Sequence, residues 1–376
     1  MNSRPLDGLT VVSIEQAVAA PFATRQLADL GARVIKVERA AGDFARGYDT
    51  KVNGEASYFV WLNRGKESVV MDLKSESDRE VLWSVLDEAD VFVENLAPGA
   101  VDRLGFSVDE LQRRNPRLIS VSISGFGSGG PYELKKAYDL IIQCESGLLS
   151  VTGTEASPAK VGISIADIAA GMYAYSGVLA ALIQRGKTGR GEHIEVSMLE
   201  ALGEWVQQTY LYAEYSGTAP KRTGAAHASI APYGPFEVSD GTVFLGLQNE
   251  REWALFCQQV LAQPELAEDP AYASNSLRVE NREQLQTIIE ERLREHTVKQ
   301  VQQLLDEIGI ANAQMRTMAE FSAHPQLEAR GRWSTIGTPS GPARVALPPV
   351  TFGSTPLGDV PMLGEHTERV FAEFRK

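Results

Sequence analysis

The chain has 376 residues, of which 36 are basic and 49 acidic, so its formal net charge at pH 7 is −13. An acidic excess repels phosphate, which excludes a protein that coats nucleic acid or an anionic membrane. It leaves open an anionic small molecule held by a local basic pocket. Hydrophobic residues make up 43% of the chain, enough for a large core, and the length predicts two or three domains.

Cysteine and histidine usage argues against disulfides and metal centres. Cys144 and Cys257 lie far apart, no CxxC pattern occurs, and the five histidines have no metal-ligand spacing. The N-terminal residues do not resemble a signal peptide. The longest apolar stretch, 163–183, carries Asp167 and several Gly, Ser and Tyr residues, so we expect a buried helix rather than a membrane span. These features predict a cytoplasmic protein without a metal cofactor.

The first 200 residues alternate short apolar runs with helical patterns, as in a doubly wound α/β domain. The expected strands are 9–14, 33–37, 68–73, 91–93, 118–123 and 193–196. The expected helices are 21–30, 77–88, 107–115, 167–184 and one from 198 to about 215. Strand, helix and strand within about thirty residues form the βαβ unit of a parallel sheet.

The pattern changes after Gly217. Residues 218–235 are rich in Ala, Gly, Pro and Ser, which indicates a linker or a functional loop. A hairpin is expected around Asp240-Gly241, followed by helices, and beyond Trp333 the chain becomes rich in proline and glycine before a short terminal helix. We therefore place a large domain at 1–217, a small domain with its linker at 218–330 and a C-terminal segment at 331–376.

A glycine-rich stretch, 125–130, satisfies the GxGxxG pattern after an expected strand. Two features argue against a dinucleotide site. The stretch lies far along the chain and no helix start follows it, while the first βα turn, 15–21, contains no glycine. We interpret it as a flexible loop over a cleft.

Asp167 follows one apolar run and opens another, which is an unusual place for a carboxylate. One interpretation is structural, because aspartate is a preferred helix N-cap and helix starts favour negative charge. The other is a nucleophilic carboxylate in a partly dry site. The residue pattern leaves both open. Several cations near strand ends could likewise hold phosphates or be ordinary surface charges; they are Arg39, Lys66, Arg103, Lys135 and Lys136.

Taken together, the ordered motifs resemble the family III CoA-transferases, the group that contains formyl-CoA and carnitine CoA-transferases and the α-methylacyl-CoA racemases. Single pieces are weak, but their order and spacing are specific and run nearly from end to end. The matching stretches are 5–8, 30–39, 93–100, 124–127 with 130–131, 138–139, 166–171, 231–233, 240–241 and 363–367.

The resemblance implies that Asp167 is the catalytic nucleophile. It implies that Val18 and Ala19 form the backbone beside the thioester, and that five residues contact coenzyme A: Arg39, Asn95, Arg103, Lys136 and Tyr138. CoA would be a co-substrate rather than a permanently bound cofactor. The implied fold is a Rossmann-like large domain, completed by the C-terminal segment, with a smaller α+β domain, in two chains that interlock as a homodimer.

Within this family the residues favour a transferase over a racemase. The racemase branch has a histidine before the aspartate that stands here at Asp139, whereas this chain has Tyr138, whose unperturbed pKa near 10 suits proton transfer at neutral pH poorly. A racemase of 2-methylacyl-CoA therefore remains the alternative. A non-catalytic CoA-binding protein is a third interpretation, disfavoured because Asp167 is present.

The substrates expected are an acyl-CoA and a small carboxylic acid. The formyl-CoA enzyme has a run of glycines where this chain reads 245–250 (LGLQNE), which argues against oxalate and formate. Arg46, Arg64 and Arg222 lie near predicted loops and could pair a second carboxylate. We therefore expect succinyl-CoA or another dicarboxylic acyl-CoA as donor, and a C4–C5 dicarboxylate such as itaconate, mesaconate or malate as acceptor.

Overall fold

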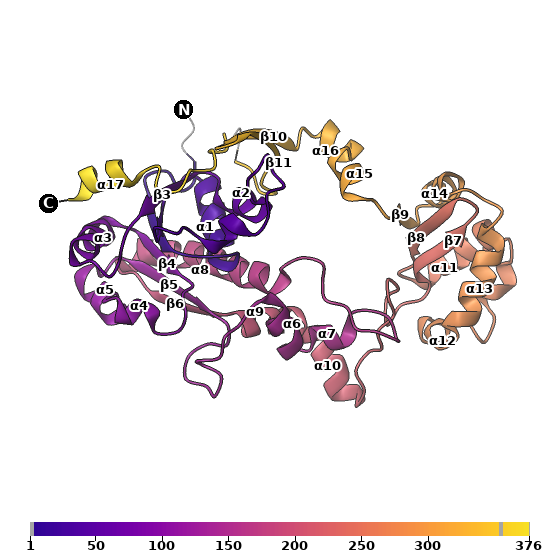
Figure 1. Ribbon diagram of the computed structural model, residues 1–376. Coiled ribbons are helices and arrows are strands. Elements are labelled where there is room, and N and C mark those ends of the chain that lie inside the picture. The colour runs from indigo at the N-terminus through magenta and orange to yellow at the C-terminus, as the bar shows by residue number, and fades with distance from the viewer. Residues whose placement is uncertain (1–3, 353–355, 376) are drawn as a thin grey trace. The chain divides into compact units, whose positions relative to one another are not determined.

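The computed structural model describes residues 4–352 and 356–375. Its contacts divide the chain into two compact units (Figure 1). The first takes the chain up to Leu148, residues 161–207, and the chain from Leu327 onwards; the second takes residues 149–160 and 208–326. The domain limits set from the sequence at 217 and 330 stay a prediction.

A parallel six-stranded sheet forms the centre of the first unit, with the strand order β3-β2-β1-β4-β5-β6 (Figure 1). The strands are β1 (Thr10–Ile14), β2 (Arg33–Glu38), β3 (Lys66–Val70), β4 (Val91–Glu94), β5 (Ile119–Ser124) and β6 (His193–Ser197). Every neighbouring pair is parallel. The order reverses between β1 and β4, and open α/β sheets bind ligands at such a switch point. The predicted parallel α/β architecture is confirmed.

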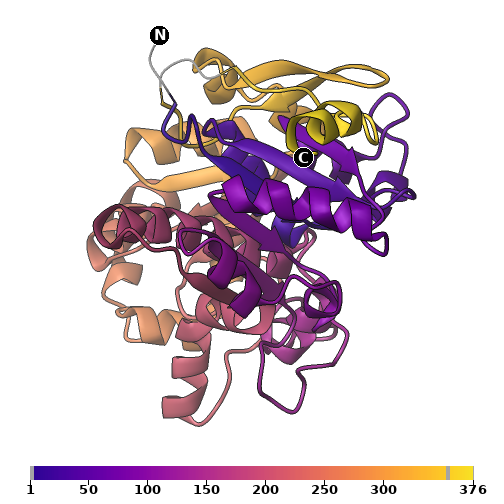
Figure 2. The same ribbon diagram turned by 90° about the vertical axis from the view of Figure 1, so that its left-hand side faces the viewer.

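Helices cover both faces of this sheet (Figure 2). Alternate residues of β1 serve the two sides: Val11 packs in the core with α1 (Ala19–Asp29) and α8 (Ile165–Thr188), and Val12 packs in the core with α3 (Glu76–Glu88) and α5 (Val108–Arg114). A period of two with apolar residues on both faces is what a parallel sheet requires.

Shorter elements complete the first unit. They are η1 (Phe44–Gly47), α2 (Ser57–Asn63), α4 (Ala100–Arg103), α6 (Asp139–Glu145), α9 (Met198–Trp205), the antiparallel hairpin β10 (Trp333–Thr338) and β11 (Gly341–Ala346), and α17 (Thr367–Phe374). Helix α17 packs against α3 and β3, and its Val370 and Phe374 enter the sheet core. The chain beyond Leu327 thus packs with the first unit.

The second unit is α+β. Its antiparallel sheet has the order β7 (Tyr233–Val238), β8 (Gly241–Gly246) and β9 (Ala311–Gln314), which includes the hairpin predicted at Asp240-Gly241. Trp253, Phe256, Leu285 and Ile289 lie in its core. Its helices are α10 (Gln207–Ser216), α11 (Glu250–Phe256), the π-helical turn η2 (Cys257–Leu261), η3 (Pro264–Ala267), α12 (Asn275–Glu280), α13 (Arg282–Leu293), α14 (Val298–Glu307), α15 (Met318–Ser322) and α16 (Pro325–Ala329); α7 (Leu148–Val151) begins where the chain enters the unit.

Two helix predictions were wrong in extent. The helix expected over 198–215 is two helices, because α9 buries Ala201 and Leu202 in the first unit whereas α10 buries none of its residues. Helix α8 begins at Ile165, before Asp167, and continues to Thr188, where Gly189 ends it in a left-handed conformation (φ 74°). By length and apolar composition α8 would suffice to cross a membrane, yet Ala169, Ala170, Ala174 and Val178 are buried in the core.

Candidate active site

Asp167 occupies the third position of α8. The N-cap is Ser164, two residues before Ala166, so the N-cap interpretation of Asp167 is wrong. The half-buried Asp167 carboxylate instead lies beside the backbone N–H of Ala19, the first residue of α1, and this N–H lowers its pKa. The start of one helix therefore faces the first turn of the other, with the carboxylate between them. Val18 is the buried N-cap of α1.

The carboxylate of Asp167 is electrostatically unusual. Its pKa is raised to about 7, chiefly because burial disfavours the charged form and secondly because the Asp139 carboxylate lies nearby; the Ala19 N–H acts in the opposite direction. A carboxylate of such basicity is a stronger nucleophile than an exposed one once it is deprotonated. Perturbed titration in a cleft is typical of functional groups.

Asp139 supplies this second carboxylate from the first position of α6. Its Oδ1 accepts from the N–H of Ala166 at 2.9 Å, and its Oδ2 accepts from Nε2 of Gln143 at 2.7 Å. The buried Gln143 in turn accepts the N–H of Val161 at 2.9 Å. These bonds fix the segment that leads into α8. They also fix the Asp139 carboxylate near the Asp167 carboxylate.

Close packing of α1 on α8 depends on Gly171, one turn after Asp167. A Cβ at Gly171 would lie 2.6 Å from the carbonyl oxygen of Ala19 and 3.0 Å from the Phe22 ring. Only glycine therefore lets the first turn of α1 approach closely enough for the Ala19 N–H to reach the carboxylate.

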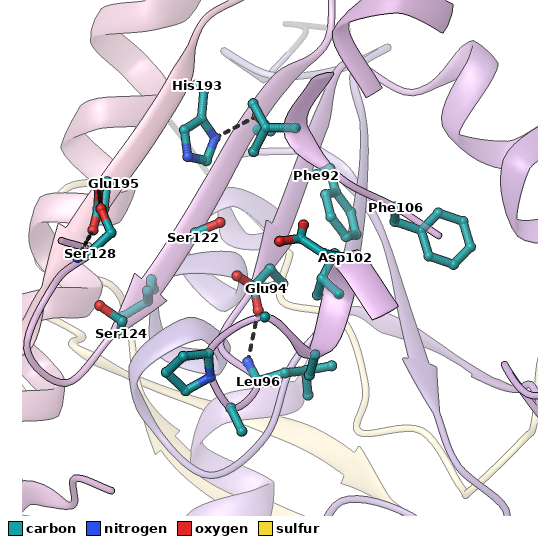
Figure 3. A pocket seen from close by; sticks show the side chains of 18 of the residues that line it. Phe92, Glu94, Leu96, Asp102, Phe106, Ser122, Ser124, Ser128, His193 and Glu195 are labelled. Atoms are coloured by element: carbon teal, nitrogen blue, oxygen red, sulfur yellow. Dashed lines mark hydrogen bonds between the residues drawn. The ribbon is translucent and has the colours of Figure 1, made fainter. Parts of the chain in front are cut away.

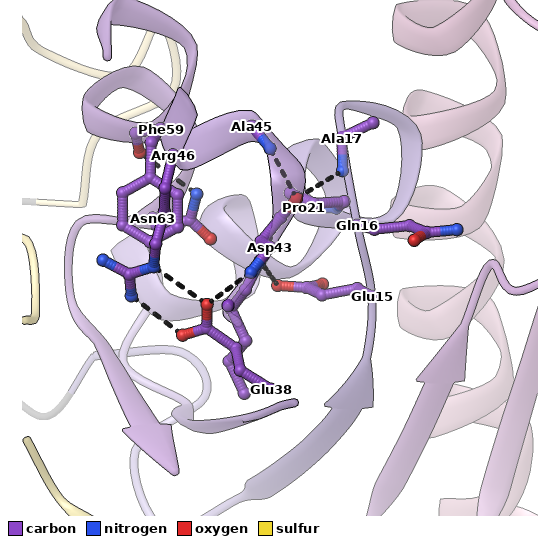
Figure 4. Close-up of polar contacts among 12 residues, drawn as sticks. Glu15, Gln16, Ala17, Pro21, Glu38, Asp43, Ala45, Arg46, Phe59 and Asn63 are labelled. Atoms are coloured by element: carbon purple, nitrogen blue, oxygen red, sulfur yellow. Dashed lines mark hydrogen bonds and ion pairs between the residues drawn. The ribbon is translucent and has the colours of Figure 1, made fainter. Parts of the chain in front are cut away.

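The β1–α1 loop is held by side chains from two other segments, of which Figure 4 shows the one that carries Asp43. Asn95, which follows β4, accepts the Gln16 N–H at 2.9 Å and donates to the Gln16 carbonyl at 2.9 Å. Asp43 accepts the N–H of Ala17 at 3.1 Å. Ala17 has φ 60°, a left-handed conformation that a residue with a Cβ rarely adopts. Strained backbone of this kind is typical of active sites.

Aromatic side chains border the site. The Tyr58 hydroxyl lies 3.2 Å from Oγ of Ser164, and the Tyr48 and Tyr58 rings meet edge to face at 5.6 Å. Burial, Asp43 and Asp167 raise the pKa of Tyr48 to about 12, so its hydroxyl stays protonated and can donate. Sequence reasoning missed both tyrosines, because they belong to none of the quoted motifs.

The residues expected to contact CoA divide into two groups. Arg39, Arg103, Lys136 and Tyr138 are exposed and free to meet a ligand; Arg39 donates to the Gly42 carbonyl at 3.0 Å and Arg103 to the Pro98 carbonyl at 3.5 Å. Asn95 differs, because both ends of its amide bond the Gln16 backbone. Their contact with CoA stays a prediction.

The three arginines proposed for a second carboxylate are engaged elsewhere. Arg46 makes two hydrogen bonds to Glu38, at 2.9 and 2.8 Å, and buried Arg64 makes two to Asp29, at 3.0 and 2.7 Å. Arg222 donates to the carbonyls of Ser150, Thr154 and Glu155. The expectation of spare guanidinium groups was therefore wrong, since sequence proximity to loops does not show partners far along the chain.

A cavity of about 260 Å³ lies on the other face of the sheet, among β4, β5, β6, α4 and α5 (Figure 3). Its acidic residues include Glu94, which accepts the Leu96 N–H at 2.8 Å, and Glu195, which binds Ser128 of the glycine-rich loop. No helix starts directly after that loop. Because Phe92 and Phe106 in its lining belong to the core opposite α1 and α8, the cavity is separate from Asp167.

A parallel α/β sheet, with a perturbed carboxylate set against a helix start beside its switch point, is typical of an enzyme that works by carboxylate chemistry. A sequence model of CoA-transferase family III matches residues 6–367, and the chain belongs to that family. It is an acyl-CoA:carboxylate CoA-transferase.

Similar proteins support this classification. The acetyl-CoA:oxalate CoA-transferase of Acetobacter aceti is 36% identical, across 91% of this chain and 89% of that protein. The succinyl-CoA:glutarate CoA-transferase of Homo sapiens is 34% identical, across 99% and 86%. The crystal structure of a CAIB/BAIF family protein from Brucella suis has a TM-score of 0.86 at 35% identity, and covers 99% of this chain and 100% of that one.

Proposed function

We propose that this CoA-transferase uses Asp167 as its nucleophile, and that it moves CoA from succinyl-CoA or a similar dicarboxylic acyl-CoA to a C4–C5 dicarboxylate. The observation that carries the proposal is the raised basicity of the half-buried Asp167 carboxylate, together with its position beside the Ala19 N–H. An ordinary surface aspartate would have neither.

In the first half-reaction an Asp167 oxygen attacks the thioester carbon of the donor, the C–S bond breaks, and CoA leaves as thiolate. The product is a mixed anhydride between Asp167 and the donor acyl group. The thiolate then attacks the aspartyl carbonyl, which releases the donor acid as its carboxylate and leaves CoA on Asp167 as a thioester. The acceptor carboxylate repeats these steps in reverse, and the Asp167 carboxylate is regenerated. No net proton is taken up or released.

The Ala19 N–H has a specific part in this sequence. In the free enzyme it lies beside the Asp167 carboxylate and lowers its pKa. When the thiolate attacks the aspartyl carbonyl, that oxygen becomes an oxyanion, and the same donor is already aimed at it. A preorganised donor at a developing oxyanion is worth roughly 10²–10³ in rate.

Two findings favour transfer over racemisation. The Asp139 carboxylate accepts bonds from Ala166 and Gln143 with its two oxygens, which restrains it as a mobile proton carrier. The relatives described above from Acetobacter aceti and Homo sapiens are named CoA-transferases. The proposed dicarboxylate preference rests on the relative named for succinyl-CoA and glutarate and on the tyrosine hydroxyls around Asp167, since the three arginines do not supply it. The homodimer implied by the family remains part of the proposal.

The proposal is tested by initial rates with succinyl-CoA against glutarate, itaconate, mesaconate, malate, oxalate and acetate. We expect ping-pong kinetics, the highest kcat/KM with a C4–C5 dicarboxylate, and loss of transfer in Asp167→Asn. Asp109→Asn is the matched control, because Asp109 also lies in the first turn of a helix, α5, but is exposed. Wild-type turnover in Asp167→Asn would overturn the assignment of the nucleophile. Equal rates with acetate and glutarate would overturn the substrate class.

A further inference from the structure

Four buried charged side chains lie beneath the β1–α1 loop, and no step of the proposed reaction uses them. They are Glu15, Lys36, Asp43 and Lys66, called here the buried charge cluster, and all four side chains are fully buried. Removing ionised groups from water is costly unless each is paired and hydrogen-bonded. An apolar core would stabilise the fold equally well, so the cluster calls for another explanation.

The Lys66 side of the cluster holds the first turns of α1. Its Nζ donates to Glu15 Oε1 at 2.7 Å, to the Pro21 carbonyl at 3.0 Å and to Asn63 Oδ1 at 3.1 Å. Glu15 Oε2 in turn accepts from the Thr24 hydroxyl at 2.7 Å. Pro21 and Thr24 both belong to α1, and both follow Ala19.

The Asp43 side holds the loop before α1. Asp43 Oδ2 accepts from Lys36 Nζ at 2.7 Å, and Lys36 Nζ lies 3.6 Å from Glu15 Oε1, which joins the two sides. Asp43 Oδ1 accepts the N–H groups of Ala17 at 3.1 Å and Ala45 at 2.9 Å (Figure 4). The left-handed Ala17 is thus held by a carboxylate that is itself held by a buried ammonium.

Ala19 lies between these two attachments. Ala17 is tied two residues before it, and Pro21 and Thr24 are tied two and five residues after it. The Ala19 N–H lies beside the Asp167 carboxylate and lowers its pKa, and the packing of α1 on α8 puts the Ala19 carbonyl 2.6 Å from a Cβ built on Gly171, one turn after Asp167. Movement of either attachment therefore displaces this donor, and a displacement of about 1 Å can cost about 100-fold in rate.

We infer that the buried charge cluster is the positioning device of the transfer reaction, and that it holds the Ala19 N–H on Asp167 while the tetrahedral intermediates form. This inference rests on the proposed role of Asp167. The four members of the buried charge cluster are positioning residues, since their side chains form hydrogen bonds to one another, to α1 and to the loop backbone.

The test compares three variants by kcat, by KM for succinyl-CoA and by the pH of the acid limb of kcat/KM. Asp43→Ala removes the acceptor for Ala17, and Asp43→Asn keeps an Oδ1 there. Asp90→Ala is the matched control, because Asp90 pairs with Arg185 and accepts the N–H of Thr10 at the opposite end of β1.

We expect Asp43→Ala to lower kcat by about 10- to 100-fold with KM changed by less than about 3-fold. The acid limb should move to higher pH, because the Ala19 N–H lowers the Asp167 pKa. Asp43→Asn should recover only part of kcat, because it keeps the acceptor for Ala17 but sets its amide N–H group against the Lys36 ammonium. Asp90→Ala should lose stability without either kinetic change. If Asp43→Ala does not fold, Thr24→Val replaces it, since that substitution keeps the shape and removes the hydroxyl that bonds Glu15 and the Ala20 and Pro21 carbonyls of its own helix. The same two kinetic changes are expected, smaller in size.

Wild-type kcat and pH profile in the folded variant, whether Asp43→Ala or Thr24→Val, would overturn the positioning role. The same changes in Asp90→Ala would also overturn it, because they would show a general loss of stability. Mass spectrometry of wild-type enzyme treated with succinyl-CoA separates the two proposals. A CoA adduct on Asp167 with unaffected variants defeats only the positioning role, whereas no adduct on wild type defeats the proposed nucleophile.

Discussion

Removing the charge of Asp167 should stabilise the protein above neutral pH while it abolishes transfer. The perturbation is Asp167→Asn, which keeps the size of the side chain. The carboxyl has a folded-state pKa of about 7 against an ordinary value of 3.8, because burial and Asp139 both disfavour its charged form. A group that the folded state prefers to keep protonated reduces stability as the pH rises above its unfolded pKa, and the reduction levels off above the folded pKa.

The size of the effect follows from this shift. A pKa raised by about three units lowers the free energy of unfolding of wild type by about 4 kcal/mol at pH 8. At pH 5, where the folded enzyme already carries the proton, the same shift lowers it by about 1.5–2 kcal/mol. Asp167 is partly exposed, and solvent screening reduces these upper values by about half. We therefore expect Asp167→Asn to raise the free energy of unfolding by about 2 kcal/mol at pH 8 and by about 1 kcal/mol at pH 5. For a cooperative unit of this size, the pH 8 value raises Tm by roughly 4 °C.

Calorimetry of wild type and Asp167→Asn at pH 5, 6, 7 and 8 measures this difference. Asp109→Asn is the control, because Asp109 also lies in the first turn of a helix, α5, but is exposed. Its effect should be a loss of a few tenths of a kcal/mol, with no growth between pH 5 and 8. A Tm gain for Asp167→Asn that is absent at pH 8, or equal at pH 5 and pH 8, would refute the claim that the folded state disfavours the charged carboxylate.

Three further predictions follow from the site. Asp139→Asn removes the negative charge beside Asp167, so the acid limb of the kcat/KM profile, expected near pH 7 in wild type, should move to lower pH; an unmoved limb would contradict the coupling of the two carboxylates. Gly171→Ala places a Cβ 2.6 Å from the Ala19 carbonyl, so it should cost about 1–3 kcal/mol of stability and about 10-fold or more in kcat, measured by urea unfolding and initial rates. The control Gly186→Ala, in the same helix with open space around it, should be neutral or stabilising by up to about 1 kcal/mol, and a similar kcat loss there would contradict the explanation. Arg222→Met should destabilise the second unit yet leave KM for glutarate within about 2-fold, because the guanidinium serves three backbone carbonyls; a large rise in KM would restore this arginine as a carboxylate ligand.

The sequence predicted the sheet well, because strands buried on both faces are short apolar runs and the helices between them are periodic. All six strands of the first unit lie within a few residues of the expected ranges. Asp167 attracted attention because a carboxylate between two apolar runs is conspicuous. The prediction of a single helix over 198–215 was wrong at the point where the chain leaves the first unit. The hydrophobic pattern alone does not show which of the two cores a residue joins.

The remaining features of the site depend on pairings between distant residues, which local pattern cannot report. Lys66 looked like a candidate phosphate ligand, but it is fully buried against Glu15, 51 positions earlier. Asn95 holds the backbone of Gln16 from 79 positions away. The approach of Ala19 to Asp167 needs Gly171 at a helix contact that only the fold creates. Motif order pointed to Asp167 as the proposed nucleophile, but the residues packed around it became visible only in three dimensions.

The central claim is that Asp167 forms a covalent thioester with CoA. Its most direct measurement is peptide mapping by mass spectrometry after wild-type enzyme is incubated with succinyl-CoA and quenched with hydroxylamine or borohydride. The account predicts modification of Asp167 in wild type, none in Asp167→Asn, and retained modification at Asp167 in Asp139→Asn. Modification of another residue, or an unmodified Asp167 in enzyme that turns over, would contradict it.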